Sequence, residues 1–370
     1  DIVPPIRPLP RLRRRLRGRR RQHQPALHPP PPQVTREARP IEVLVHAPRG
    51  GIHQHRPAAQ ACHCGHLRAK RTIPTHSPPE PVLLPVKRVD HISMAAPGWK
   101  AQAETLERLL GFKFLHSWDA SPGSGFEGCV SQVRGTDIEF EIISPAGQGS
   151  FVQKFLDEQG PGLHHIAVEV HSIHEAAAEL ERLGIKPFGG ITSDGLWHLT
   201  YIHPKDSGGI LWQLFEPYRS PGEFDRNAGG GAANLQRIDH VSMAVPSLER
   251  QVEWQQRVFG GEVEGRWTEE RLGYHGAIMS IPGSLLKFEI IQPARPESVV
   301  QEFIDTRRPG MHHICCEVAS VEAACDGLRA NGIEPFGGII DEGWKKHTFL
   351  HPKDSGGVLF QLFEEPPAAT

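Results

Sequence analysis

The pattern of apolar and polar positions changes sharply near residue 86. From Val89 onward, short segments with alternating apolar positions predict strands, and segments with apolar residues at helical spacing predict helices. The segment 99–110 is predicted to be a helix, because its leucines fall on one face and Gly111 follows it. Up to Phe215, the predicted order is one strand, one helix and three strands, and this order occurs twice.

The boundaries of these predicted elements follow from where apolar periodicity starts and where glycine or proline interrupts it. The expected helices are 99–110, a segment around 151–158, and 173–183. The expected strands are 89–95, 112–118, 129–133, 138–143, 163–170, 186–188, 199–203 and 210–215.

The same series of segments returns later in the chain, offset by 149 residues at its first segment and by 148 residues at the others. Such an internal repeat indicates two copies of one structural unit. The matched segments are Asp90-His91-Ile92 with Asp239-His240-Val241, Gly162-Leu163-His164-His165-Ile166 with Gly310-Met311-His312-His313-Ile314, and His203-Pro204-Lys205-Asp206-Ser207 with His351-Pro352-Lys353-Asp354-Ser355.

The repeat divides the chain into four parts: 1–86, a first module at 87–217, a linker at 218–236 and a second module at 237–366. Residues 1–86 are rich in proline and arginine, with nine arginines between Arg7 and Arg21, and lack apolar periodicity. Such a segment cannot bury enough apolar surface to offset its ordering entropy, so we expect disorder. Its Cys62-His63-Cys64-Gly65-His66 cluster has no second ligand pair, which argues against a zinc site.

Charge and cysteine content exclude some functional classes. The formal net charge of −2 gives no bias toward nucleic acid or membrane, and there is no apolar run of 18 residues and no secretory signal pattern. The six cysteines form no spaced framework, which favours a reducing cytoplasm. Cys315 and Cys316 stand where the first copy has Ala167 and Val168, so we expect them to be small core residues.

Polar residues recur at matched positions inside apolar strand segments of both copies. A charged group such as Glu141 is costly in such a setting unless it is paired or binds a metal. Because side chains alternate between strand faces, residues from several strands can converge inside a curved sheet. Two imidazoles, one carboxylate and one carboxamide suit a borderline divalent ion: Co, Mn, Ni, Zn or Fe. The candidate metal ligands are His91, Glu141, His165 and Gln213 in the first copy and His240, Glu289, His313 and Gln361 in the second.

A structural explanation competes with this metal hypothesis. A single strand histidine or glutamate usually faces solvent or makes a structural hydrogen bond, and recent duplication would also preserve matched residues. Four polar positions kept in register nevertheless favour the metal interpretation, since drift after duplication has little reason to retain them for packing.

The matched segments resemble methylmalonyl-CoA epimerases of the vicinal-oxygen-chelate (glyoxalase-like) superfamily. The resemblance covers residues 88–217 and 237–366. It implies an α+β fold of tandem modules, each of two βαβββ units that form a cupped, half-barrel mixed sheet around one metal ion. The motifs that carry it in the first copy are Asp90-His91-Ile92, Glu141-Ile142-Ile143-Ser144-Pro145, Gly162-Leu163-His164-His165-Ile166 and Ile202-His203-Pro204-Lys205-Asp206-Ser207-Gly208-Gly209.

The chain departs from the epimerase pattern in its ligand order. Epimerases generally place glutamate on the last strand, where this chain has Gln213 and Gln361. Some of them have glutamine at the earlier position, which here is Glu141 and Glu289. The carboxylate and the amide have exchanged places, so we expect metal binding to be retained while the orientation of the substrate changes.

A second departure concerns the base that would remove a proton. In at least one epimerase, a glutamate shortly before the first carboxylate strand's ligand is the candidate base. The nearest register here gives Ser131 and Met279, which cannot serve. Glu127 and His275 lie close by in predicted loops, but they differ between the copies.

The remaining candidate bases are the ligand carboxylates Glu141 and Glu289, which the resemblance with glyoxalases suggests as catalytic residues. The leading hypothesis is a metal-dependent, epimerase-like enzyme that stabilises an enolate of a small or acyl-CoA substrate. The alternatives are an Fe(II) ring-cleaving dioxygenase of the same superfamily and a non-catalytic metal- or ligand-binding protein. We expect no membrane or specific nucleic-acid partner, and either a monomer that mimics a dimer internally or a homodimer.

The His-Pro-Lys-Asp block has a simpler explanation than metal binding. His203 and His351 precede a predicted turn, and we expect them to be turn or substrate-edge residues. Lys205 and Lys353 could meet a phosphate or CoA, although a solvated turn lysine explains them equally.

Overall fold

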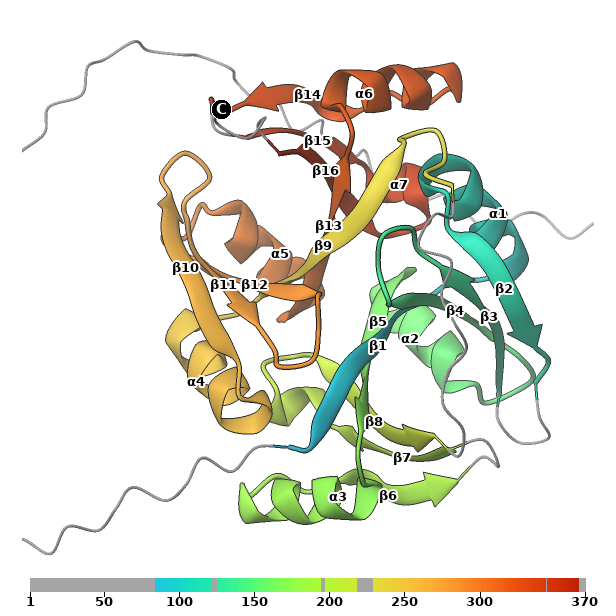
Figure 1. The fold of residues 1–370 in the computed structure, drawn as a ribbon, viewed down its shortest axis with the longest axis vertical. Coiled ribbons are helices and arrows are strands. Elements are labelled where there is room, and N and C mark those ends of the chain that lie inside the picture. The colour runs from blue at the N-terminus through green and yellow to red at the C-terminus, as the bar shows by residue number, and fades with distance from the viewer. Residues whose placement is uncertain (1–83, 121–124, 194–196, 218–228, 344, 366–370) are drawn as a thin grey trace, which may run out of the picture. The chain divides into compact units, whose positions relative to one another are not determined.

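The computed structural model describes residues 84–120, 125–193, 197–217, 229–343 and 345–365 (Figure 1). The chain divides into two units, Asp1–Ile73 and Pro74–Thr370, and every described residue belongs to the second unit. The predicted disorder of residues 1–86 and the Cys62–His66 cluster therefore fall almost entirely outside the described residues.

The first half of the described chain forms one mixed sheet of eight strands with helices packed against it (Figure 1). The strand order across this sheet is β2-β3-β4-β1-β5-β8-β7-β6. The elements are β1 (Val86–Ala95), α1 (Trp99–Leu110), β2 (Lys113–Trp118), β3 (Phe126–Gln132), β4 (Glu139–Pro145), α2 (Phe151–Gln159), β5 (Gly162–Val170), α3 (Ile173–Arg182), β6 (Phe188–Ser193), β7 (Trp197–Ile202), a short 3-10 helix (Pro204–Asp206) and β8 (Leu211–Pro217).

The second half repeats this arrangement in the strand order β10-β11-β12-β9-β13-β16-β15-β14. The elements are β9 (Leu235–Ala244), α4 (Leu248–Phe259), β10 (Glu262–Glu269), β11 (Tyr274–Ser280), β12 (Lys287–Pro293), α5 (Val299–Arg307), β13 (Gly310–Val318), α6 (Val321–Ala330), β14 (Phe336–Asp341), β15 (Lys346–Leu350), α7 (Pro352–Ser355) and β16 (Leu359–Glu364).

Each sheet consists of two βαβββ units joined along their first strands. Strand β1 pairs in parallel with β4 and antiparallel with β5, and β5 pairs in parallel with β8. Strands β9, β12, β13 and β16 repeat these pairings in the second sheet. The predicted α+β fold with a doubled βαβββ module is therefore confirmed.

The largest departure from the predicted strands is at β6. Apolar periodicity predicts a strand that ends at Phe188, whereas β6 begins there and continues to Ser193. Gly189 and Gly190 interrupt the apolar pattern with φ values of 80° and 69°. The register with β7 shifts between Phe188 and Thr192, so the strand continues through an irregularity that the residue pattern hides.

A shared apolar core joins the two modules. One cluster of buried side chains includes residues of both sheets. The ring of Trp212, on β8, lies 4.6 Å from that of Phe259 and 5.5 Å from that of Phe288. Phe112 of the first module likewise contacts the second module, with its ring 6.1 Å from that of Phe360. Large apolar side chains of each module are therefore packed against those of the other module.

Two matched polar contacts flank this core. The Gln102 amide of α1 donates a 2.8 Å hydrogen bond to the Ser355 carbonyl, and the Gln251 amide of α4 donates one of 3.4 Å to the Ser207 carbonyl. These positions correspond under the repeat, so the contacts are reciprocal, as in an isologous dimer interface. Among the described helices, none has the length and apolar character needed to cross a membrane.

Candidate metal centres

The predicted ligands of the first module share one face of its sheet. Ser93 on β1 lies opposite both Glu141 on β4 and His165 on β5, so these side chains point to the same face. His91 precedes Ser93 by two residues and shares that face. Gln213 on β8 lies opposite Ala167, two residues beyond His165. We name this face the first cup.

The ligand atoms of the first cup converge closely. The Nε2 atoms of His91 and His165 are 3.3 Å apart. The Oε2 atom of Glu141 lies 3.5 Å from Nε2 of His165 and 3.9 Å from Nε2 of His91. The Gln213 side chain is buried on the same face. The two histidines and the glutamate therefore converge at one point, with Gln213 on the adjacent strand β8.

The second module places its four predicted residues in the same way, on a face that we name the second cup. Ser242 lies opposite both Glu289 and His313, and His240 precedes it by two residues. Nε2 of His313 lies 3.6 Å from Oε2 of Glu289, and the potential ligand atoms of the two histidines and the glutamate all lie within 4.8 Å of one another. Gln361 on β16 lies opposite Cys315, two residues beyond His313.

Aspartates at matched positions orient the first histidine of each cup. Asp90 accepts a 2.8 Å hydrogen bond from Nδ1 of His91, and Asp239 accepts an equal bond from His240. Each bond fixes the ring so that Nε2 points toward the cluster, as in many metal-binding histidines. Burial alone would raise the pKa of Asp90, but the bond to His91 and the charge of Arg88 lower it, so its carboxylate is ionised.

A second histidine orients the ligand histidine on β5 and β13. The Nδ1 atoms of His164 and His165 are 2.9 Å apart, and those of His312 and His313 are 2.8 Å apart. Burial lowers the pKa of His164 and of His312 to about 4, so both are neutral near pH 7. The double-histidine motif thus pairs one candidate ligand with one neutral orienting residue.

The donor set fits a divalent cation. Four buried atoms of these clusters have no hydrogen-bond partner among the described residues: Oε2 of Glu141, Oε2 of Glu289, Nε2 of His240 and Nε2 of His313. Buried polar atoms without partners are costly, and here their lone pairs face one another. A cation bound by two imidazoles, one carboxylate and one carboxamide would satisfy them, and borderline divalent ions prefer this mixture of nitrogen and oxygen.

The candidate bases outside the clusters lie on the wrong face. Glu127 and His275, expected in loops, lie within β3 and β11 instead. Their partners across the sheet are Ser144 and Gln292, which alternate with the cup-facing residues. Ser131 lies opposite Phe140 and also points away from the first cup. None of these three side chains faces a candidate metal cluster.

Sequence reasoning missed Glu139, which precedes Glu141 by two residues and lies opposite His91. Burial, together with the negative charge of Asp90, raises the pKa of Glu139 to about 7. The matched residue of the second module is Lys287, which forms a 2.7 Å ion pair with Glu264. The surroundings of the two clusters therefore differ in charge.

The His-Pro-Lys block forms a turn, as predicted. Nδ1 of His203 accepts a 3.1 Å hydrogen bond from the Lys205 backbone and caps the short helix that follows. His351 caps α7 in the same way. The ring of His203 packs edge-on against Phe188 at 4.7 Å, so this histidine takes no part in the first metal cluster.

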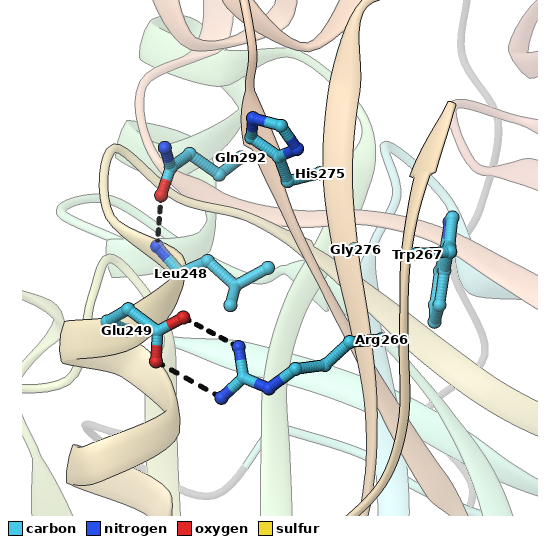
Figure 2. A pocket seen from close by; sticks show the side chains of 7 residues that line it. All are labelled: Leu248, Glu249, Arg266, Trp267, His275, Gly276 and Gln292. Atoms are coloured by element: carbon cyan, nitrogen blue, oxygen red, sulfur yellow. Dashed lines mark hydrogen bonds and ion pairs between the residues drawn. The ribbon is translucent and has the colours of Figure 1, made fainter. Parts of the chain in front are cut away.

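A surface pocket of the second module lies apart from the clusters (Figure 2). It opens beside the start of α4, where Glu249 and Arg266 form two contacts of 2.6 and 3.1 Å. Gln292 accepts a hydrogen bond from the Leu248 backbone at its rim. The lining residues are Leu248, Glu249, Arg266, Trp267, His275, Gly276 and Gln292, and none of them is a candidate metal ligand.

Comparison with known proteins agrees with this geometry. The family model of the glyoxalase/bleomycin resistance protein/dioxygenase superfamily matches residues 90–201 and 239–350. The chain is 34% identical over 137 residues to mitochondrial methylmalonyl-CoA epimerase of Homo sapiens, covering 36% of this chain and 76% of that protein. It is 33% identical over 130 residues to ethylmalonyl-CoA/methylmalonyl-CoA epimerase of Cereibacter sphaeroides, covering 34% of this chain and 96% of that protein.

A solved structure extends the likeness to both modules. A variant of 4-hydroxymandelate synthase from Streptomyces coelicolor matches with a TM-score of 0.57 and 15% identity, covering 78% of this chain and 95% of that one. At this identity the match shows a common fold alone. The family model, in contrast, matches each half of the described chain separately, and the chain therefore belongs to the glyoxalase/bleomycin resistance protein/dioxygenase superfamily.

Proposed function

We propose that the chain is a metal-dependent enzyme that removes a proton next to a carbonyl group, most like an acyl-CoA epimerase. The observation that carries this proposal is the convergence, in each cup, of potential ligand atoms from two histidines and a glutamate. In the second cup all three of these buried atoms have no hydrogen-bond partner among the described residues, and in the first cup the Glu141 oxygen has none. The likeness to epimerases of methylmalonyl-CoA and ethylmalonyl-CoA favours this reaction and suggests a substrate of that class.

In this proposal, His91, Glu141, His165 and Gln213 hold a divalent ion in the first cup, and the four matched residues hold one in the second. The bound ion would supply Lewis-acid stabilisation of the negative charge that develops on the carbonyl oxygen. The Asp90 and His164 side chains keep the two imidazoles oriented, because each forms a contact to a ligand histidine.

Glu141 and Glu289 are the proposed proton acceptors. Oε2 of each is buried and has no hydrogen-bond partner among the described residues, so it can accept a proton without breaking an existing bond. The neighbours of Glu141 on β4 include Phe140 and Ile142, which are fully buried and help to exclude water from this strand. A general base must lie within hydrogen-bonding reach of the proton that it removes, and both carboxylates lie at the cluster itself.

Deuterium uptake from heavy water into methylmalonyl-CoA tests this function. The wild-type chain, supplied with divalent metal, should exchange the α-proton. The Glu141→Gln/Glu289→Gln variant should lose exchange by about 100-fold or more, because an amide keeps a ligand oxygen but cannot accept the proton. It should retain bound metal, which metal analysis would check.

The Glu127→Gln/His275→Gln variant is the matched control, because both residues lie on the outer face of their sheets. It should exchange like the wild type. If the wild type exchanges no deuterium over a panel of acyl-CoAs and 2-oxo acids, the proposed reaction is wrong. If no divalent ion is found in either cup, the metal assignment is wrong as well.

An Fe(II) dioxygenase is the second candidate. Two histidines and one carboxylate with open positions are the ligand set of non-haem iron oxygenases, and each cup brings such a set together. Oxygen consumption with catechols in the presence of Fe(II), without deuterium exchange, would favour this reaction over epimerisation.

A further inference from the structure

At four matched positions of the cup walls, the first module has an apolar residue where the second has a polar or reactive one. Strand registers place three of these pairs at corresponding positions, and the fourth, Trp197 with Lys345, corresponds by the repeat offset of 148 residues. The pairs are Phe126 with Tyr274, Ala167 with Cys315, Trp197 with Lys345, and Leu199 with His347.

His347 lies on the wall of the second cup. It is opposite Phe363 on β16, which follows Gln361 by two residues, so its side chain shares the face of the ligand Gln361. The histidine is only 6% exposed, and its Nδ1 atom has no hydrogen-bond partner among the described residues. A buried polar atom without a partner on the wall of a cup suggests that a bound ligand supplies the missing hydrogen bond.

Lys345 brings positive charge close to the same cup. Its Nζ atom lies 4.7 Å from the ring centre of Phe363, the residue opposite His347. This ammonium group therefore lies against the ring of the residue that is paired with His347.

Burial, followed by the charges of Lys345 and Arg271, lowers the pKa of His347 to about 4, so its ring is neutral near pH 7. In the first cup, Trp197 and Leu199 occupy the positions of Lys345 and His347. Trp197 there packs its ring edge-on against Phe215 at 5.5 Å.

Two other matched positions vary in the opposite sense. Tyr201 and Thr192 of the first module correspond to Phe349 and Ile340 of the second. None of these four side chains carries a charge, so they do not offset the contrast between the cups. Glu139 and Lys287, beside the first histidine of each cluster, extend it in the same direction.

We propose that the second cup binds the carboxylate of an anionic ligand between its metal cluster and a wall formed by Lys345 and His347, whereas the first cup lacks this selectivity. The inference rests on the proposed function, since it names the substrate class of the same site. Lys345 would donate a charge-assisted hydrogen bond to the carboxylate, and the unpartnered Nδ1 of His347 would donate a second one.

Calorimetric titration with malonate, a small dicarboxylate, tests this assignment on the full chain, both loaded with Mn²⁺ and metal-free. The wild type should show one tighter malonate site per chain. Lys345→Gln and His347→Leu should each weaken that site by about tenfold, the effect of one charge-assisted bond. Thermal melting would check that each variant remains folded.

Two controls separate this effect from a general loss of charge or shape. Lys346 is adjacent in the chain, but its Nζ forms a 2.8 Å ion pair with Glu322, and its partner across the sheet, Glu364, alternates with the cup-facing residues. Lys346→Gln should therefore leave malonate affinity unchanged. Trp197→Ala, in the first cup, should also leave it unchanged.

Two results would overturn the inference: equal malonate affinity in Lys345→Gln and the wild type, or equal weakening by Lys345→Gln and Lys346→Gln. Failure of the proposed function has a different signature: the wild type exchanges no deuterium, and if the metal assignment is also wrong, it binds no Mn²⁺. In either case the titration of the metal-free chain still reports whether Lys345 holds the anion.

Discussion

His347 makes the stability of the chain depend on pH. Its folded-state pKa of about 4 lies below the 6.5 that is usual for histidine, so the unfolded chain binds more protons between these values. The contribution of neutral His347 to the free energy of unfolding is fully present above its unfolded-state pKa. It is lost as the pH falls toward the folded-state pKa. In the wild type, this effect should lower the free energy of unfolding by roughly 2 to 3 kcal/mol between about pH 7 and about pH 4.5. We expect His347→Leu, which introduces the residue found at the matched Leu199, to abolish this decrease.

Urea unfolding with EDTA present at both pH values would measure this difference. His164 and His312, whose pKa values burial also lowers to about 4, should still make the variant less stable in acid. Replacement of the exposed His275 by leucine is the control and should leave the slope unchanged. An equal loss of stability in His347→Leu and the wild type would contradict the prediction.

Much of each cluster could be predicted from single residues. Polar positions such as His91 and Glu141 stand out because they interrupt apolar strands and recur in the second copy. The orienting roles of Asp90 and His164 could not be predicted in this way, because they depend on which ring nitrogen faces which neighbour. Glu139 was missed because its surroundings come from β1, which is distant in sequence.

Helix α1 ends at a position where glycine serves two purposes. Gly111 has a φ of 73°, and a Cβ atom there would lie 2.2 Å from the Gly229 carbonyl oxygen and 2.5 Å from the Gly231 nitrogen. The chain entering the second module also satisfies the end of α1, since the Ala232 amide donates to the Arg108 carbonyl at 2.9 Å. The end of the helix and the start of the second module are therefore packed together.

We expect Gly111→Ala to destabilise the chain more than Gly184→Ala. Gly184 follows α3 with a φ of 76°, but a Cβ there would meet nothing within 4 Å. Gly184→Ala should cost about 1–2 kcal/mol for the left-handed conformation alone. Gly111→Ala should cost several kcal/mol in addition, because backbone atoms would have to move, and urea unfolding of both variants would show it. An equal decrease in the free energy of unfolding in the two variants would mean that the backbone at Gly229 can move to accommodate the new Cβ atom without a cost in stability.

Helices were predicted more accurately than strands. The predicted bounds of α1, 99–110, match those of the structure, where Gly111 directly follows the last helical residue. Strand β3 begins at Phe126, three residues before the predicted start, since Gly128 breaks the apolar alternation. Pairing with β4 at Phe126–Pro145 extends the strand there, and such pairing cannot be read from local pattern.

At the scale of the whole molecule, the repeat predicted two modules but not how much core they share. Trp212 is fully buried, with rings of the second module as its neighbours. A single module would expose this surface to water. The domain limits 87–217 and 237–366 remain a prediction, and β9 begins at Leu235, two residues before the predicted start of the second module. Because the two cores are packed against each other, we expect that neither module is stable alone.

The shared core predicts that both modules unfold together. Trp212→Ala removes a large buried ring, which in protein cores costs about 3–5 kcal/mol, and the cavity would border the rings of Phe259 and Phe288 on the other module. Far-UV circular dichroism and tryptophan fluorescence should therefore follow one coincident urea transition, shifted as a whole in the variant. Two separate transitions, with only the first shifted, would show that the modules are energetically independent. A single transition whose urea midpoint does not change with protein concentration would further indicate that one chain supplies both halves of the pseudo-dimer. A dissociating dimer would instead unfold at a midpoint that rises with protein concentration.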